Sequence, residues 1–468
     1  MMESCKMKDS LSSHLSRREA LKILGLSPIT AELLFSHTEA EAAEDVKGKI
    51  VIVGGGAGAI MALSRLLRSI KNPDITVIAP NDIHIYQPGQ VFVAAGEMQE
   101  RDLFLNNADY IDTEKVNWIK DEVERFDPKN NQVRTRGGKE VVYDYLIVAT
   151  GVVYHYERIE GLTKEDIGKN GISSVYLSDL AKGTAQGGPI TWQWFNDLKD
   201  AAKKGRPKVI YTQPNTPIKC GGAPQKILML SADYLKQDNL AADYYFCTAN
   251  KKLFHLPEVD AELHKVQQRY DKIENRFSHY LKAIDVKNKK ATFIHAYEKD
   301  VYDEDFDTHE KVSVSENVVM DYDFIHIVPP MSPPDAVVNS ELANDAGWLE
   351  VDKFTLQHKR FENVFGIGDV CGIPMGKTGG SARHHGPILV KNLIEVMKGK
   401  KPSEKFDGYT VCPLKTQYGK IIMAEFNYKG PAPTISFLSI EKPRWMWWFF
   451  DLYMLEPMYK YLMLRGLF

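Results

Sequence analysis

KIVIVGGGAGA, at Lys49–Ala59, is the stretch that decides the fold, because it joins a short apolar run directly to a glycine-rich turn. The run Lys49–Val53 is typical of a buried parallel strand, and the residues Ile60–Ser69 that follow have a helical pattern. A second apolar run, Ile75–Ile78, comes at the distance expected of the next parallel strand. These residues predict the first unit of a doubly wound α/β sheet.

The glycine turn predicts a dinucleotide site at the start of the helix. Gly54 allows the tight turn, Gly56 lets a pyrophosphate approach the backbone, and Ala59 keeps the helix close to the strand. One position departs from the pattern. Ala79 stands at the end of the second strand, where an acidic residue would hold the ribose, so Asn81, Asp82 or a water molecule would have to serve.

Two later strand ends complete the pattern of a flavoprotein. The run Tyr145–Ala149 leads into an Ala-Thr-Gly turn, and Asn363–Val370 (NVFGIGDV) leads into a Gly-Asp turn. Together with the glycine turn they resemble the two-dinucleotide-domain flavoprotein reductases, in which the acidic residue of the Gly-Asp turn binds the ribityl chain of FAD. The resemblance implies FAD contacts at Thr150, Gly151, Gly368 and Asp369.

The middle of the chain, Gly171–Pro330, reads as a second doubly wound unit inserted in the first. It has its own apolar runs, at Val209–Tyr211, Asp243–Phe246 and Phe324–Val328. Its first strand is followed by TQPNTPIKCGG, which lacks the glycine fingerprint of a nicotinamide site. This absence argues against NAD(P)H as the source of electrons.

We therefore expect two Rossmann-like doubly wound domains, the second inserted in the first, followed by amphipathic helices at a membrane interface. The expected limits are a twin-arginine signal peptide at 1–43, the first part of the FAD-binding domain at 44–165, the second Rossmann-like domain at 166–330, the second part of the FAD-binding domain at 331–400, and a quinone and membrane-interface region at 401–468.

The net charge and the cysteine content exclude several classes of partner and site. The formal net charge of -3 on 468 residues implies no general attraction to nucleic acid. The five cysteines are too few and too widely spaced for a disulfide scaffold or a zinc site. The sequence leaves open whether two of the cysteines form a specific pair and whether the protein is a homo-oligomer.

The N-terminus reads as an export signal. SRREALK at Ser16–Lys22 contains the twin arginine, the modestly apolar Ile23–Phe35 follows, and Ala40–Ala42 suits cleavage by its small residues. This pattern predicts delivery of the folded protein to the periplasm and a mature chain that begins near Ala43. The alternative is an amphipathic surface helix.

Cys220 and Cys371 are the two candidate reactive thiols. Cys220 lies in PNTPIKCGGAPQK between a strand and a helix start, where the helix dipole favours a thiolate. Cys371 follows Asp369 at another strand-to-helix turn, so both would face the cleft between the domains. The alternative is a pair of isolated core cysteines.

The phrases NTPIKCGGAPQK, IHIYQPGQVFVAAG, GDVCGIPMGKTGG and FDGYTVCPL resemble the sulfide:quinone oxidoreductases over most of the mature chain. The resemblance implies Cys220 and Cys371 as the redox-active pair and places Lys377 near the flavin ring or the quinone. It leaves Cys247 and Cys412 as structural residues. His384 and His385 allow two interpretations. One of them could relay a proton to quinone, or the two could be a capped or surface pair at the start of a helix.

The C-terminal stretch Arg444–Phe468 concentrates the membrane signal. It contains Trp445, Trp447 and Trp448, but charged residues and a proline interrupt it well short of the ~20 apolar residues needed to span a bilayer. It therefore predicts two short amphipathic helices in the headgroup region. The alternative is a helical hairpin that docks on a partner or a second subunit.

These expectations combine into one function, the FAD-dependent oxidation of sulfide to polysulfide or persulfide sulfur at a cysteine pair, with electrons passed to membrane quinone. The enzymatic alternatives are the flavoprotein subunit of a flavocytochrome c sulfide dehydrogenase and, less well matched, a type II NADH dehydrogenase. The non-enzymatic alternative is a flavin-binding redox sensor.

Overall fold

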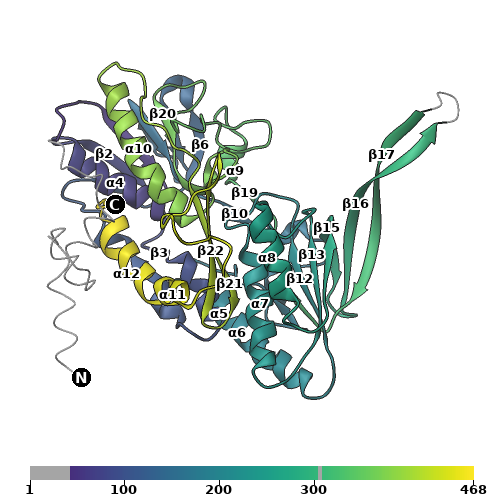
Figure 1. Cartoon of the computed structure of the whole chain (residues 1–468). Coiled ribbons are helices and arrows are strands. Elements are labelled where there is room, and N and C mark those ends of the chain that lie inside the picture. The colour runs from purple at the N-terminus through teal and green to yellow at the C-terminus, as the bar shows by residue number, and fades with distance from the viewer. Residues whose placement is uncertain (1–42, 304–307) are drawn as a thin grey trace, which may run out of the picture.

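Two parallel sheets form the body of the molecule, and the first is built from segments on both sides of an insertion (Figure 1). The structure, a computed structural model, describes residues 43–303 and 308–468. All neighbouring strands of the first sheet run parallel. In spatial order they are β20 (Val364–Gly366), β9 (Tyr145–Val148), β1 (Lys49–Val53), β2 (Asp74–Ile78) and β5 (Asn117–Ile119).

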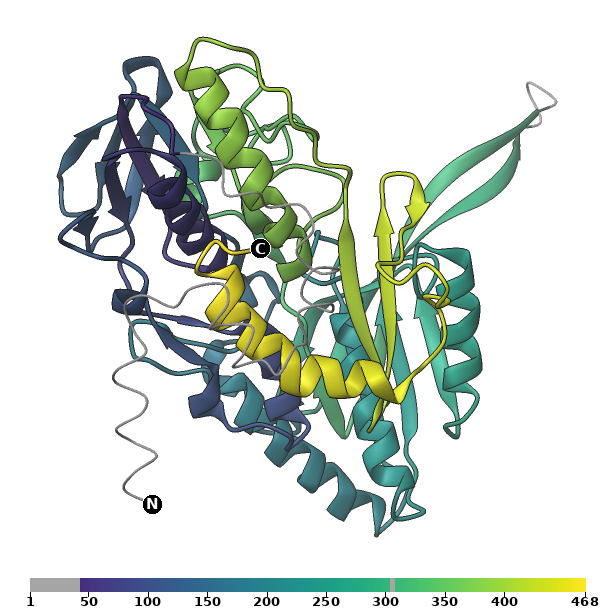
Figure 2. The ribbon, with the colours of Figure 1, turned by 60° about the vertical axis from the view of Figure 1, so that its left-hand side comes forward.

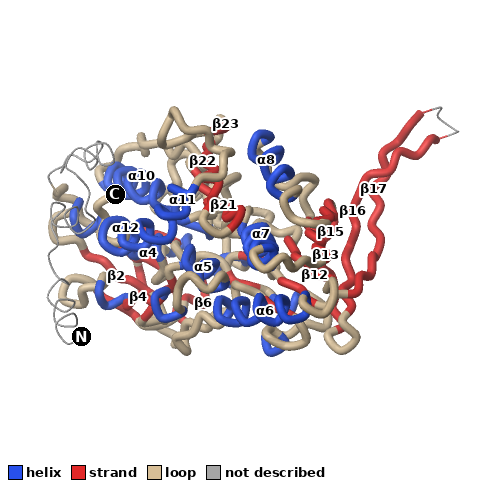
Figure 3. The backbone as a smooth tube through the Cα atoms, turned by 60° about the horizontal axis from the view of Figure 1, so that its bottom comes forward, coloured by secondary structure: helices blue, strands red, loops and turns tan. Residues whose placement is uncertain are grey.

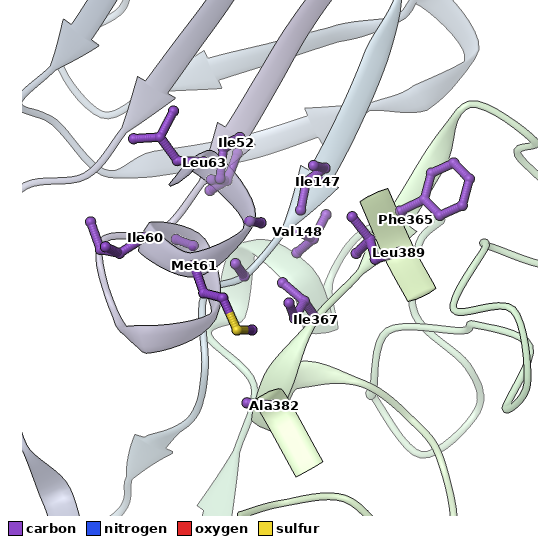
Figure 4. Close-up of a cluster of buried hydrophobic side chains, with 14 of the residues drawn as sticks. Ile52, Ile60, Met61, Leu63, Ile147, Val148, Phe365, Ile367, Ala382 and Leu389 are labelled. Atoms are coloured by element: carbon purple, nitrogen blue, oxygen red, sulfur yellow. The ribbon is translucent and has the colours of Figure 1, made fainter. Parts of the chain in front are cut away.

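Helices α4 (Ala57–Ser69) and α10 (Gly379–Met397) pack side by side against this sheet. They approach closely at Gly386 of α10, where a Cβ would lie 2.7 Å from Cε of Met61. The strands are apolar along their length because they are buried on both faces, as parallel strands usually are. Figure 4 labels ten members of the cluster that results: Ile52, Ile60, Met61, Leu63, Ile147, Val148, Phe365, Ile367, Ala382 and Leu389.

The second sheet is also parallel and lies wholly within the inserted segment. It orders β11 (Ile172–Ser173), β18 (Phe324–His326), β12 (Lys208–Gln213), β13 (Asp243–Thr248) and β14 (Ile273–Phe277). Its helices are α6 (Gly187–Ala202), α7 (Ala223–Lys236) and α8 (Pro257–Gln267). The predicted fold class, one doubly wound unit inserted in another, is therefore confirmed, whereas the exact domain limits stay a prediction.

A long antiparallel ribbon extends from the second domain away from the body (Figure 1). It consists of β15 (His279–Asp285), β16 (Lys290–Asp303) and β17 (Thr308–Asp321). Smaller elements connect the sheets: β3 (Ile83–Ile85), α5 (Gln90–Ala94), β4 (Phe104–Asn106), β6 (Val123–Asp127), β7 (Gln132–Thr135), β8 (Glu140–Val142), β10 (Val153–Tyr154), β19 (Met331–Ser332) and α9 (Asp335–Val338).

After α10 the chain forms a hairpin and then a helical segment that crosses both domains (Figure 2). The hairpin comprises β21 (Thr410–Gln417), β22 (Lys420–Asn427) and β23 (Gly430–Pro431). The C-terminal segment, Trp445–Met463, begins with α11 (Trp445–Phe449) and continues through α12 (Leu455–Met458), with wider π-type turns after each helix.

Both ends of the C-terminal segment are held by hydrogen bonds to other elements. At its start the backbone of Arg444 exchanges hydrogen bonds with Ile421 of β22, at 2.9 and 3.1 Å. Beyond its end, Ser64 Oγ of α4 donates to the carbonyl of Leu464 at 2.7 Å. Figure 3 shows α11 beside the hairpin and α12 beside α4. Within the described part of the chain, no helix is both long enough and apolar enough to cross a membrane.

The expected twin-arginine signal at 1–43 falls almost entirely outside the described residues.

Candidate functional site

The glycine turn after β1 has the geometry that a bound dinucleotide requires. Gly54 has a φ of 130°, and a Cβ there would lie 2.3 Å from the carbonyl oxygen of Ala149. Gly56 caps α4, and the space where its Cβ would be built contains no atom within 4 Å. The turn therefore presents open space at the N-terminus of a long helix, which suits a phosphate group.

Two further turns meet the glycine turn at the carboxyl ends of neighbouring strands. Gly151, after β9, and Gly368, after β20, have φ values of 68° and 79°, and a Cβ at either would meet nothing within 4 Å. Thr150 Oγ1 is buried and has no hydrogen-bond partner among the described residues. An unpaired buried hydroxyl beside open space indicates a missing polar group. The predicted cofactor residues thus lie together, and they fit a dinucleotide.

Of the residues that follow Ala79, Asp82 forms an exposed ion pair with Lys120. The backbone carbonyl of Asn81 accepts a hydrogen bond from Asn107 Nδ2 at 2.9 Å. Asn107 also lies against Gly55, since a Cβ on that glycine would be 3.1 Å from its amide nitrogen. This fully buried amide was not singled out from the sequence.

Cys220 occupies the predicted strand-to-helix turn, between β12 and α7, in a left-handed conformation with a φ of 53°. Its backbone N–H donates to the carbonyl of Lys377 at 2.8 Å. Its sulfur lies 3.3 Å from the sulfur of Cys412, which β21 contributes. Both residues are free thiols in the structure. Two thiols at this distance need only a small movement to form a disulfide.

The structure places Cys220 beside Cys412, so the predicted pair of Cys220 and Cys371 is not confirmed. Cys371 is fully buried in the core of the first domain, where a Cβ on Gly366 would lie 3.0 Å from its sulfur. Cys220 and Cys412 instead pack in the core of the second domain and the hairpin. Burial raises the pKa of Cys371 to about 12, which keeps it a thiol. The turn after Asp369 places the backbone of Cys371 near the cofactor side but directs its side chain inward.

Lys226 completes the thiol pair. It lies on α7, and its buried Nζ donates to the sulfur of Cys220 at 3.0 Å. The hydrogen bond from Cys412, and after it the charge of Lys226, lower the pKa of Cys220 well below the usual value despite burial. The same hydrogen bond, together with burial, raises the pKa of Cys412 well above the usual value. The pair is therefore polarised, with Cys220 as thiolate and Cys412 as thiol.

Two lysines approach Asp369 at the boundary between the cofactor cradle and the thiol pair. Lys377 Nζ donates to the carbonyls of Asp369 and Cys371, at 2.7 and 2.9 Å, and lies 3.6 Å from the ring centroid of Trp348. Lys219 lies 4.5 Å from the ring centroid of Tyr154. Burial lowers the pKa of each lysine to about 8. Burial also raises the pKa of Asp369, against the opposing charges of both lysines.

His384 and His385 do not behave as histidines that titrate near neutrality. His385 is fully buried, and its Nδ1 accepts the backbone N–H of Gly368 at 3.2 Å. Burial lowers its pKa to about 3. His384 stacks on Tyr409 with ring centroids 4.2 Å apart, and burial lowers its pKa to about 4. His385 supports the Gly-Asp turn and His384 packs on Tyr409, both as neutral rings, which agrees better with a structural role than with a proton relay.

Sequence reasoning missed Cys412 and Lys226. Both stand inside phrases that carry the resemblance, FDGYTVCPL and NTPIKCGGAPQK. The available signal was therefore the phrase itself, since no local pattern shows that a cysteine on a hairpin reaches a turn in another domain.

Comparison with known proteins agrees with the geometry. A family model described as pyridine nucleotide-disulphide oxidoreductase matches residues 48–183. The mitochondrial sulfide:quinone oxidoreductase of Dictyostelium discoideum is 37% identical over 406 residues, which cover 86% of this chain and 82% of that relative. The mitochondrial sulfide:quinone oxidoreductase of Mus musculus is 34% identical, with coverages of 89% and 86%.

The fold is also found in a solved structure. The X-ray structure of the sulfide:quinone oxidoreductase from the hyperthermophilic bacterium Aquifex aeolicus matches with a TM-score of 0.66 at 20% identity, and covers 90% of this chain and 91% of that one.

Proposed function

Because the chain belongs to the sulfide:quinone oxidoreductase family, we propose that it oxidises sulfide at the Cys220–Cys412 pair, with FAD as cofactor and a membrane quinone as electron acceptor. The observation that carries the proposal is the 3.3 Å contact between these two sulfurs, beside a buried lysine. Such a polarised pair is suited to thiol–disulfide exchange with hydrosulfide. The flavocytochrome c alternative has no comparable support among the relatives.

FAD would lie in the cradle formed by Gly54, Gly56, Thr150, Gly151 and the Gly368–Asp369 turn. The open space at these glycines and the unpaired hydroxyl of Thr150 support this placement. Bound there, FAD would supply the two-electron chemistry that links a thiol pair to quinone.

The polarity of the pair suggests which sulfur receives sulfide. In the oxidised state, hydrosulfide attacks the sulfur of Cys412, forms a new S–S bond and breaks the bond to Cys220. The products are a Cys412 persulfide, which keeps the hydrosulfide proton, and a Cys220 thiolate. A thiolate of low pKa is the better leaving group, and Lys226 stabilises the charge that appears on Cys220.

A second nucleophile, such as hydrosulfide or a small thiolate, then attacks the outer sulfur of the persulfide. The new S–S bond carries that sulfur away as polysulfide or persulfide, and Cys412 is left as a thiolate that takes up a proton. The high pKa of Cys412 favours this protonation. Closure of the pair to a disulfide releases two electrons and the remaining proton.

The C-terminal segment is proposed to bind the membrane surface on the periplasmic side. Trp445, Phe449 and Tyr453 recur every four residues, so they share one helix face, and they are 71%, 51% and 59% exposed. Trp448 and Leu452, which directly precede Phe449 and Tyr453 in the chain, are buried. An exposed aromatic stripe of this kind fits a lipid interface. The periplasmic side rests on the twin-arginine sequence alone.

The test replaces Cys220, Cys412 and Cys371 one at a time. We expect Cys220→Ser and Cys412→Ala to lower sulfide-dependent reduction of a quinone analogue by at least about 100-fold, because neither variant can form the disulfide. Cys371→Ala is the matched control, equally buried but outside the pair, and should keep most of the activity. The FAD absorbance of each variant checks its folding. Loss of activity in Cys371→Ala together with normal activity in Cys412→Ala would support the predicted pair of Cys220 and Cys371 instead.

A further inference from the structure

A second buried lysine lies near the thiol pair, and its partner comes from the C-terminal segment. Lys415 follows Cys412 on β21, and its Nζ lies 2.5 Å from Oδ2 of Asp451. The two side chains are 2% and 0% exposed. The same ammonium lies 4.4 Å from the ring centroid of Phe92. Because water is excluded from this ion pair, each of its charges acts strongly on nearby groups.

Four charges share this buried region. Lys226 and Lys415 are positive, and the Cys220 thiolate and Asp451 are negative. Lys415 acts to lower the pKa of Cys220, and Asp451 acts to raise the pKa values of both lysines. The charges sum to zero only when Cys220 is ionised. The other groups that act on Cys220 from neighbouring elements are the Cys412 thiol, the Tyr176 hydroxyl and Asp369.

Asp451 satisfies only part of its hydrogen-bonding capacity. Its Oδ1 is buried and has no hydrogen-bond partner among the described residues, although its Oδ2 pairs with Lys415. The buried carboxylate therefore holds its negative charge beside Lys415.

We propose that Lys415 and Asp451 are positioning residues for the thiol pair, and that the C-terminal segment thereby supplies the counter-charge that sets how readily Cys220 becomes a thiolate. The inference deepens the proposed function, in which Cys220 is the leaving thiolate. It also gives the segment that faces the membrane a direct electrostatic contact with the site of sulfide chemistry.

The two residues should act in opposite directions. Without Lys415, Asp451 is left to compete with the thiolate for Lys226, so the ionised form of Cys220 becomes less favourable. Without Asp451, Lys415 loses its partner and the Cys220 thiolate becomes its remaining counter-charge, which favours the ionised form. A role confined to holding the fold together would not produce opposite signs.

The experiment measures the rate at which iodoacetamide modifies Cys220 in the reduced, full-length protein between about pH 4 and 9, followed by peptide mass spectrometry. The midpoint is the pH at which Cys220 is alkylated at half its maximal rate. We expect this midpoint to rise by about one pH unit in Lys415→Met and to fall by about one pH unit in Asp451→Asn. The double variant, which removes both charges, should stay close to the wild type. Lys415→Gln and Asp451→Ser replace these variants in the experiment if either of them fails to fold.

Lys460→Met is the matched control, because Lys460 pairs with Glu456 in the same segment. It should leave the Cys220 midpoint unchanged. Equal shifts in Lys415→Met and Asp451→Asn, or no shift in either, would overturn the inference. The titration needs no sulfide turnover, so it separates the two hypotheses: if Cys220→Ser still oxidises sulfide, the proposed function fails while the charge coupling stands.

Discussion

Lys226 is the charged residue that contacts the sulfur of Cys220 and favours its thiolate. Because the pKa of Cys220 is lowered, its thiolate is already formed above that lowered pKa, and alkylation of the reduced protein should be nearly independent of pH between about pH 6 and 8. Lys226→Met removes the cation, raises the pKa, and should slow alkylation at pH 6 by about tenfold, with recovery as the pH rises.

Lys219→Met provides the matched control for this titration. Lys219 is next to Cys220 in sequence, but its Nζ donates to Gln87 Oε1 instead of the sulfur. The control should keep the flat alkylation profile of the wild type. A flat profile in Lys226→Met as well would show that the lysine does not stabilise the thiolate.

Gly54 and Gly56 should respond differently to the same substitution. Gly54→Ala places a methyl group 2.3 Å from a backbone oxygen at a φ that favours glycine, so we expect it to destabilise the folded protein by about 2 kcal/mol or more. Gly56→Ala meets no protein atom within 4 Å. It should leave the melting temperature of the apoprotein unchanged but lower the FAD content. Full FAD occupancy in Gly56→Ala would contradict the placement of the cofactor.

Residues in local patterns could be predicted from the sequence, and residues in long-range contacts could not. Gly54, Gly56 and Cys220 belong to strand–turn–helix units, in which neighbours in sequence are neighbours in space. Cys412 meets Cys220 across 192 positions. Cys371 matches the same local pattern as Cys220, but its side chain lies in the core of the first domain, and a turn position does not show which way a side chain points.

At the level of elements, the start of α7 must approach β21 closely for the thiols to meet. A Cβ on Gly222 would lie 2.1 Å from Cδ2 of Leu414 and 2.9 Å from the sulfur of Cys412. We therefore expect Gly222→Ala to push the helix and the strand apart. It should reduce the yield of the Cys220–Cys412 disulfide under mild oxidation by at least about fivefold, as measured by peptide mapping.

Gly221→Ala tests whether this effect comes from packing. The two glycines are adjacent, but a Cβ on Gly221 would meet nothing within 4 Å. Gly221→Ala should therefore form the disulfide as the wild type does. Equal yields in the two variants would mean that the approach of α7 to β21 does not control the pair.

The composition of the C-terminal segment predicts only part of its structure. The aromatic residues and the interrupting charges correctly indicated short helices. Asp451, however, was counted only as an interruption of the apolar run, and it proves to be buried against Lys415. Apolar periodicity cannot show this, because a buried charge is tolerated only through a partner that lies elsewhere in the chain.

For the whole molecule, the candidate site exists only when three parts of the chain are docked. The first domain supplies the glycine cradle, the inserted domain supplies Cys220 and Lys226, and the hairpin supplies Cys412 and Lys415. The fold class was predictable because each parallel unit carries its own apolar pattern and turn. The assembly was not, because the contacts between the parts depend on how complete domains pack.

The C-terminal segment should hold the assembled molecule at a lipid surface through its exposed aromatic stripe. A variant with Trp445→Ser, Phe449→Ser and Tyr453→Ser should bind phosphatidylglycerol-containing vesicles at least about 100-fold more weakly, because three aromatic side chains no longer enter the interface. Sulfide oxidation with a water-soluble quinone analogue should continue, since these side chains are exposed whereas Cys412 is buried. Val142→Ser, which alters a 57% exposed side chain on β8, is the control in vesicle sedimentation. Undiminished vesicle binding by the triple variant would assign the stripe to a protein partner or a second subunit.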